Sequence, residues 1–134
     1  MKAMGALFEY GKRWAAWCLI AAIGILSLLP GAEVGPIRTS LGGHLEHLLA
    51  YTVTTLMTAV AYADHSRFKI ALSLILYAGV LEYLQRFSPG RLSSVLDFTF
   101  SSTGVMLGVA TFHVVRHLRE KHPRYANPDL GSGA

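Results

Sequence analysis

Residues 82–91 read Glu-Tyr-Leu-Gln-Arg-Phe-Ser-Pro-Gly-Arg, and they connect the end of one apolar run, residues 70–84, to a second run, residues 95–115. Glu82 and Gln85 are three positions apart, so on a helix their side chains share one face. The Pro-Gly pair that follows predicts a turn. A charged side chain within an apolar span costs about 2.5–3.5 kcal/mol at the centre of a bilayer and less near its edge. The stretch therefore predicts two apolar helices joined by a sharp turn, with polar groups that need partners.

The composition of the whole chain indicates a membrane protein. Of its 134 residues, 52% are hydrophobic and only 15% are charged, whereas soluble domains usually carry about 25% charged residues. Four apolar segments are each close to the roughly 20 residues that span a bilayer; they are residues 14–29, 45–63, 68–84 and 95–115. We therefore predict an all-α fold, a polytopic membrane protein that forms a compact bundle of four transmembrane helices. Residues 1–115 would form its single domain.

Both ends of the chain are basic. Basic residues before the first apolar segment would also fit a cleaved signal peptide, but Pro30-Gly31-Ala32 is a poor cleavage site and three more apolar segments follow. We therefore expect the first segment to be retained as a helix. At the other end, residues 116–134 are basic and then rich in Pro, Asn and Gly. This composition predicts a disordered cytoplasmic tail.

Lysine and arginine are distributed unevenly between the two sides of the predicted bundle. Nine of the twelve lie in the termini, between the second and third segments or at the start of the third, whereas Arg38, Arg86 and Arg91 lie in the other two connections. Cytoplasmic loops of membrane proteins carry the excess of basic residues. The distribution therefore predicts that both termini are cytoplasmic and that the Pro-Gly turn faces outward.

This topology brings polar residues of three helices to one depth near the outer surface. These residues are His44 and His47 of the second segment, Glu82 and Gln85 of the third, and Asp97 and Ser101 of the fourth. Lipid offers no hydrogen-bond partners, so such side chains are expected to face the interior of the bundle. We expect them to converge around Arg91, because a guanidinium group can bridge two carboxylates or hold an anionic ligand.

Small and hydroxyl-bearing residues recur at helical spacing on two of the segments. Thr54 and Thr58 continue a polar stripe along the second segment, and Gly104 and Gly108 form a GxxxG pattern in the fourth. The GxxxG pattern lets helix backbones approach closely. We therefore interpret both features as helix packing and predict that the two glycines face another helix.

The roles of the charged and ligand-type residues stay open at this point. His44 and His47 have the type and spacing of metal ligands, but the HExxH frame is missing and no cysteine stands near them; we predict no metal and no cofactor. Glu82 and Asp97 are either an acid–base pair or the counter-charges of the two outer arginines. The basic tail has no interleaved aromatic residues, so we expect lipid contact and no nucleic acid.

Taken together, these residues resemble the VanZ-like family of membrane proteins. The resemblance covers roughly residues 15–110 and is carried by Leu28-Leu29-Pro30-Gly31, His47-Leu-Leu-Ala50-Tyr51, Glu82 with Gln85, Pro89-Gly90-Arg91, Asp97, Ser101 and Gly104. The chain departs from the family pattern at Gly43-His44, where the family often has Asp-Lys, and at Ser101, where it usually has Asn. The family is named for a protein associated with low-level teicoplanin resistance.

The resemblance implies a multi-pass protein of the bacterial inner membrane with a polar cluster that faces the cell envelope. We expect it to bind or modulate an envelope component, lipid-linked or glycopeptide-related, with membrane lipids as its other partners. The candidate ligand-binding residues are His47, Tyr51, Glu82, Gln85, Arg86, Arg91, Asp97 and Ser101. The alternative is an intramembrane enzyme that acts on a lipid-linked substrate with Glu82 or His47 as general base. A third possibility is that the cluster only holds the bundle together.

Overall fold

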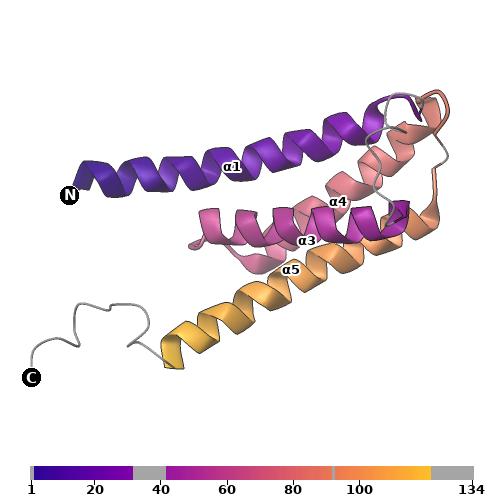
Figure 1. Ribbon diagram of the computed structural model, residues 1–134. Coiled ribbons are helices and arrows are strands. Elements are labelled where there is room, and N and C mark those ends of the chain that lie inside the picture. The colour runs from indigo at the N-terminus through magenta and orange to yellow at the C-terminus, as the bar shows by residue number, and fades with distance from the viewer. Residues whose placement is uncertain (1, 32–41, 92, 122–134) are drawn as a thin grey trace, which may run out of the picture.

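The computed structural model describes residues 2–31, 42–91 and 93–121, and the regular elements among them are helices. They are α1 (Lys2–Leu28), α3 (Gly43–Ala61), α4 (Arg67–Leu84), the short 3₁₀ helix η1 (Gln85–Phe87) and α5 (Val95–Lys121). Figure 1 shows that each long helix runs opposite to the one before it, so α1 begins and α5 ends at the same end of the molecule. We call this the terminal end, and we call the other the turn end. The prediction of an all-α fold is confirmed.

Three of the helices are long and apolar enough to cross a membrane, at Met4–Leu28, Arg67–Phe87 and Val95–Lys121. The chain is therefore a helical membrane protein. Helix α3, which was predicted as the second transmembrane helix, does not belong to this group. Its 19 residues would measure about 28 Å, but Glu46, two histidines and several threonines make it too polar. The prediction of four spanning helices is thus supported for three of them.

The outer helices extend beyond the apolar segments that predicted them. Helix α1 begins at Lys2 rather than at residue 14, and an ion pair of 2.6 Å between Lys12 and Glu9 supports its added turns. Helix α5 continues to Lys121, where an ion pair of 2.8 Å joins Arg116 to Glu120. The prediction of a disordered tail from residue 116 is therefore wrong for residues 116–121, because good helix formers continue the last turns into a polar environment. The predicted tail from residue 122 onward lies outside the described residues.

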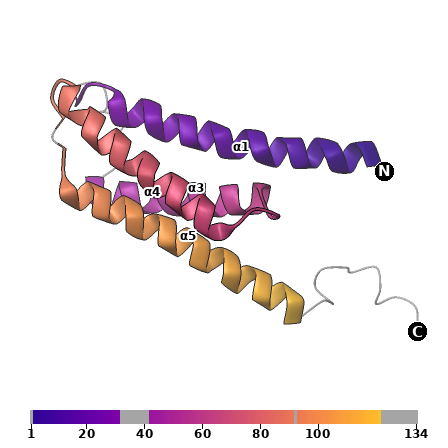
Figure 2. The ribbon, with the colours of Figure 1, turned by 180° about the vertical axis from the view of Figure 1, so that it is seen from behind.

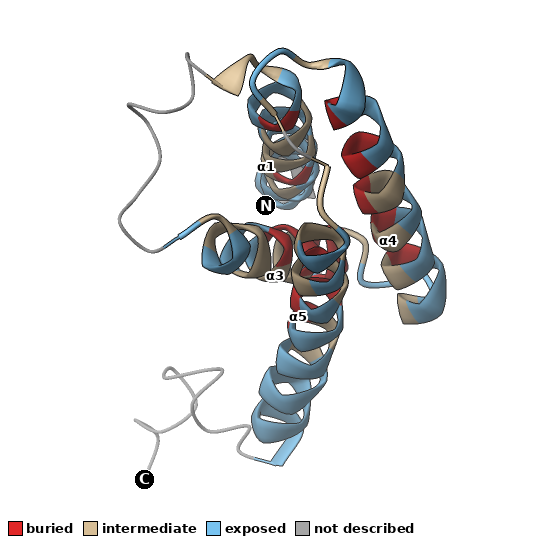
Figure 3. Cartoon of the chain, turned by 90° about the vertical axis from the view of Figure 1, so that its right-hand side faces the viewer, coloured by how far each residue is buried: buried red, intermediate tan, exposed pale blue. Residues whose placement is uncertain are grey.

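The exposed faces of the helices are largely apolar, and the buried positions include polar side chains as well as apolar ones. The buried polar side chains are Ser27, Thr54, Thr55, Thr58, Glu82, Gln85 and Ser101. On α3, by contrast, Leu49 and Val53 are exposed, and on α4 Leu76 and Val80 are exposed. Figure 3 shows the buried positions of α4 on its side toward the other helices. This arrangement suits lipid, which solvates apolar side chains and leaves polar ones to find partners inside the bundle.

Helix α3 makes its most extensive contact with α5. The GxxxG glycines lie in this contact: Gly104 packs against the Leu48 carbonyl, and a Cβ at Gly108 would stand 2.6 Å from Thr55 Cβ and 2.7 Å from the Thr52 carbonyl oxygen. There is no room for a side chain at either glycine. The prediction that they face another helix is confirmed.

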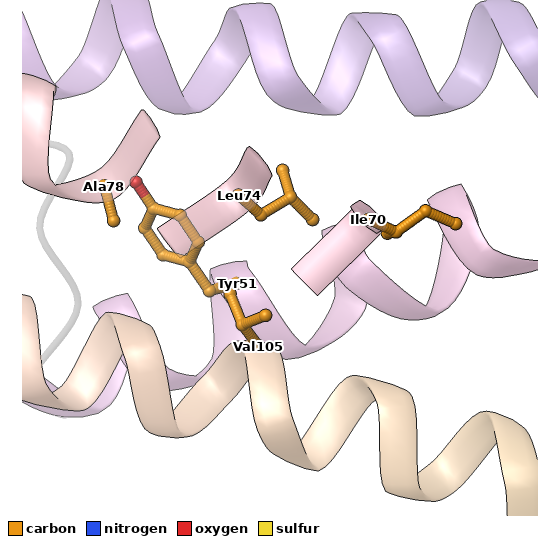
Figure 4. Close-up of a cluster of buried hydrophobic side chains, with 5 residues drawn as sticks. All are labelled: Tyr51, Ile70, Leu74, Ala78 and Val105. Atoms are coloured by element: carbon orange, nitrogen blue, oxygen red, sulfur yellow. The ribbon is translucent and has the colours of Figure 1, made fainter. Parts of the chain in front are cut away.

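Tyr51 joins the core where α3, α4 and α5 meet. It is only 2% exposed and packs with Ile70, Leu74, Ala78 and Val105. In Figure 4 its hydroxyl group points toward α4 and lies beside Ala78. The Tyr51 hydroxyl group is therefore buried among side chains that are otherwise apolar.

At the turn end, the two predicted chain breaks contact each other. The Gly31 amide donates a hydrogen bond of 3.0 Å to the Pro89 carbonyl, and the Ser88 hydroxyl donates one of 2.8 Å to the Leu28 carbonyl. Gly90 has a φ of 73°, in the left-handed region that favours glycine. The Pro-Gly turn therefore ends one helix and fixes the end of another.

Candidate functional site

Two side-chain pairs join α3 to α5 near the turn end. His44 Nδ1 lies 2.6 Å from Asp97 Oδ1, and His47 Nδ1 lies 3.1 Å from Ser101 Oγ. His44 also stacks on Phe100, with ring centroids 5.3 Å apart. The second and fourth predicted segments therefore do present their polar residues at one depth, and these residues hold the two helices in register.

Glu82 is buried, at 8% exposure, and its carboxylate accepts a hydrogen bond from the backbone amide of Ser94. Ser94 directly precedes α5, and its carbonyl oxygen accepts a bond of 3.2 Å from the Phe98 amide, as the first residue of a helix cap does. The positive end of a helix dipole stabilises a carboxylate at this position. The cost of burying Glu82 is thus offset by the start of α5 rather than by an arginine.

Gln85 and Tyr51 are the most deeply buried of the candidate residues, at 2% exposure each, together with Ser101. Glu82 lies close enough to Tyr51 to interact with it electrostatically. Within the described part of the chain, the hydrogen bonds do not include one from the Gln85 side-chain amide or from the Tyr51 hydroxyl. Most buried polar groups in native structures do have a partner. In the described part of the chain, the fully buried side-chain atoms without a hydrogen-bond partner are Thr55 Oγ1 and Ser102 Oγ, and neither belongs to a candidate residue.

The arginines have different positions from those predicted. Arg91 donates from Nε to the Leu29 carbonyl at 3.2 Å and from Nη2 to the Leu26 carbonyl, so it caps the end of α1. The predicted bridge from Arg91 to Glu82 and Asp97 is not formed, because among the described residues these carboxylates bond to Ser94 and His44 instead. A helix C-terminus attracts cations just as a carboxylate does.

Arg86 is also remote from the buried groups. It is exposed, and its guanidinium group lies over the Tyr83 ring at 5.4 Å from the centroid.

The polar cluster consists of His44, His47, Tyr51, Glu82, Gln85, Asp97 and Ser101. Sequence reasoning missed one contributor, the backbone amide of Ser94, although a serine before an apolar helix is a common helix start. In the residues that the structure describes, no three side chains of His, Cys, Asp or Glu gather closely enough to hold a metal ion. The cluster instead offers hydrogen-bond donors and acceptors from three helices.

Searches of family models, of curated proteins and of solved structures gave no match to this chain.

Proposed function

We propose that the chain is a VanZ-like inner-membrane protein that binds the head group of a cell-envelope component through the polar cluster. The observation that carries this proposal is the gathering of buried polar side chains from three helices near the turn end, namely Tyr51, Glu82, Gln85 and Ser101. Polar groups inside a membrane helix bundle are costly and often mark a binding site. A head group that forms hydrogen bonds with these side chains would bind there.

The chemistry of the cluster favours a neutral head group that forms hydrogen bonds. The Gln85 amide and the Tyr51 hydroxyl can each donate and accept. Glu82 adds a carboxylate that already accepts from Ser94, whereas Arg86 is exposed. Sugar hydroxyls and peptide amides fit these groups, and a lipid-linked envelope precursor carries both on a membrane anchor.

Helix α3 lies inside the bilayer in this proposal, although it is too polar to stand there alone. Support comes from its outward face, where Leu45, Leu49, Val53 and Val60 are exposed, while its threonines are buried against the other helices. The turn end faces the envelope, and the terminal end faces the cytoplasm, as the positive-inside rule requires.

Native mass spectrometry of the protein extracted in detergent tests the binding proposal. We expect wild-type protein to carry a co-purified lipid-linked molecule and Gln85→Leu, which keeps the volume of the side chain, to lose it. Thr55→Val is the matched control, because Thr55 is a buried polar residue like Gln85 but lies in the contact between α3 and α5, against Gly108. Retention of the adduct by Gln85→Leu, or its equal loss from Thr55→Val, would contradict the proposal.

An intramembrane enzyme is the second candidate, and the pairing of His47 with Ser101 favours it. The distance of 3.1 Å between His47 Nδ1 and Ser101 Oγ is within reach of a base and its nucleophile. The same mass spectra distinguish the two functions: Ser101→Ala should carry a chemically different adduct, the unconverted substrate, if the cluster catalyses, whereas the adduct of a binding site should keep the same mass even if less of it is bound.

A further inference from the structure

The terminal end carries a second feature that is independent of the polar cluster. Figures 1 and 2 both show α1 extending past the hairpin between α3 and α4. Where α1 passes the hairpin, Tyr10, Arg13, Trp14 and Trp17 follow one another at intervals of three or one, on one face of the helix, and line an open surface cavity of about 360 Å³. We propose that this cavity binds the head group of an anionic phospholipid.

The depth of the cavity in the membrane follows from the hairpin. Trp17 Nε1 donates a hydrogen bond of 2.9 Å to the Tyr62 hydroxyl, so the cavity begins at the level of Tyr62. Residues 62–66 are not helical, and irregular backbone that faces lipid does not occur within the hydrocarbon region. The hairpin therefore marks the membrane boundary, and the cavity lies at the level of the lipid head groups.

The aromatic lining suits this level. Tyr10 is 62% exposed, Trp14 is 70% exposed and Trp17 is 57% exposed. Large exposed aromatic side chains are costly in water, but they are enriched at the membrane interface, where one part of the ring system contacts acyl chains and the polar atom contacts head groups.

The charge of the cavity selects an anion. The Arg13 guanidinium group lies over the Tyr62 ring, 5.4 Å from its centroid, and among the described residues no ion pair engages Arg13. A guanidinium group binds phosphate through two parallel hydrogen bonds, and basic pockets beside membrane helices attract anionic lipids. Free phosphate has the same oxygen atoms, but the aromatic walls match a phosphate that carries acyl chains.

The tryptophan content of the chain makes a direct test possible. The sequence has two tryptophans, and both line this cavity. The full-length protein is reconstituted in phosphatidylcholine vesicles that contain a minor fraction of brominated lipid, either phosphatidylglycerol or phosphatidylcholine. We expect several-fold stronger quenching of tryptophan fluorescence by the brominated anionic lipid.

Variants identify the residue responsible. Arg13→Gln should remove the excess quenching, and Arg13→Lys, which keeps the charge but loses the planar fork, should reduce it. Arg119→Gln removes a charge from the exposed end of α5 and should leave the excess unchanged. Circular dichroism verifies that each variant folds. If Arg13→Gln does not fold, the test uses Arg13→Lys alone.

Three outcomes would overturn the inference. They are equal quenching by both lipids, an equal effect of Arg119→Gln and Arg13→Gln, and loss of the excess when inorganic phosphate is added. The last would assign the cavity to a soluble anion.

Discussion

The residue that the sequence marked as most costly, Glu82, has a structural partner in the backbone of another helix. Its carboxylate accepts from the Ser94 amide at the start of α5. The macrodipole contributes about 0.3–1 kcal/mol to such a contact, and up to about 2 kcal/mol in partly buried geometries. One side chain thus joins the end of α4 to the beginning of α5 across the Pro-Gly turn.

Two substitutions of Glu82 measure separately how much its charge and its hydrogen bond contribute to stability. Glu82→Gln keeps an acceptor and should lower the free energy of unfolding by about 1 kcal/mol, the size of the lost dipole interaction. Glu82→Ala also leaves the Ser94 amide without its acceptor and should cost about 1–3 kcal/mol more. Melting temperatures in detergent would measure both effects, with exposed Glu120→Gln as the control. Equal destabilisation by Gln and Ala would show that the hydrogen bond contributes nothing.

At the scale of the element, the contact between α3 and α5 depends on the two glycines. Gly108→Leu should lower the melting temperature strongly, since overpacking costs about 1–3 kcal/mol and here the added side chain meets the backbone of α3. Gly11→Leu is the matched control, because nothing lies within 4 Å of a Cβ at Gly11 in α1. A neutral result at Gly108 would mean that the two helices are not in close contact.

Helix ends show a second pattern at this scale, in which arginines serve as C-terminal caps. Arg67 donates from Nη1 to the carbonyls of Ala59 at 2.8 Å and Tyr62 at 3.1 Å, at the end of α3. Arg91 does the same for α1. A guanidinium group can satisfy several of the carbonyl groups that are left unpaired at a helix C-terminus.

The sequence was sufficient to predict the helices but not the partners of their charges. The predicted starts of α4 and α5 agree with the structure to within one residue, because polar loops border clear apolar runs. The start of α1 and the end of α5 were not predicted, because an apolar run shows only which residues suit lipid. A helix can continue beyond that run into water. The partner of Arg91 was missed because carbonyls at a helix end have no sequence pattern of their own.

At the scale of the whole molecule, the apolar exposed surface and the polar side chains buried within the bundle suit a membrane as the surrounding solvent. The exposed face of α3 is rich in Leu and Val, and its buried face is rich in Thr. This distribution explains how α3 can belong to the bundle although its hydropathy is too low for a solitary span.

Labelling with a membrane-impermeant maleimide tests the orientation. In a Cys18→Ser background, Pro89→Cys in the turn should be labelled from outside intact cells, because Pro89 is exposed and lies beyond the spanning segment that ends at Phe87. His65→Cys in the hairpin should be labelled only after the membrane is permeabilised, since the hairpin lies toward the terminal end. The opposite pattern would invert the topology and would place the polar cluster on the cytoplasmic side.

The hydrogen bonds that join the end of α1 to the Pro-Gly turn have a consequence for how the protein is synthesised and inserted. Helix α1 leaves the ribosome first, yet the side chain that caps its Leu29 carbonyl is 62 residues further along the chain, and the Ser88 hydroxyl that bonds to Leu28 is 60 residues further. During synthesis the end of α1 must therefore wait in the insertion machinery, or be held by water or lipid head groups, until the turn has been translated. The end of α1 is therefore completed only after α4 and the Pro-Gly turn have been synthesised.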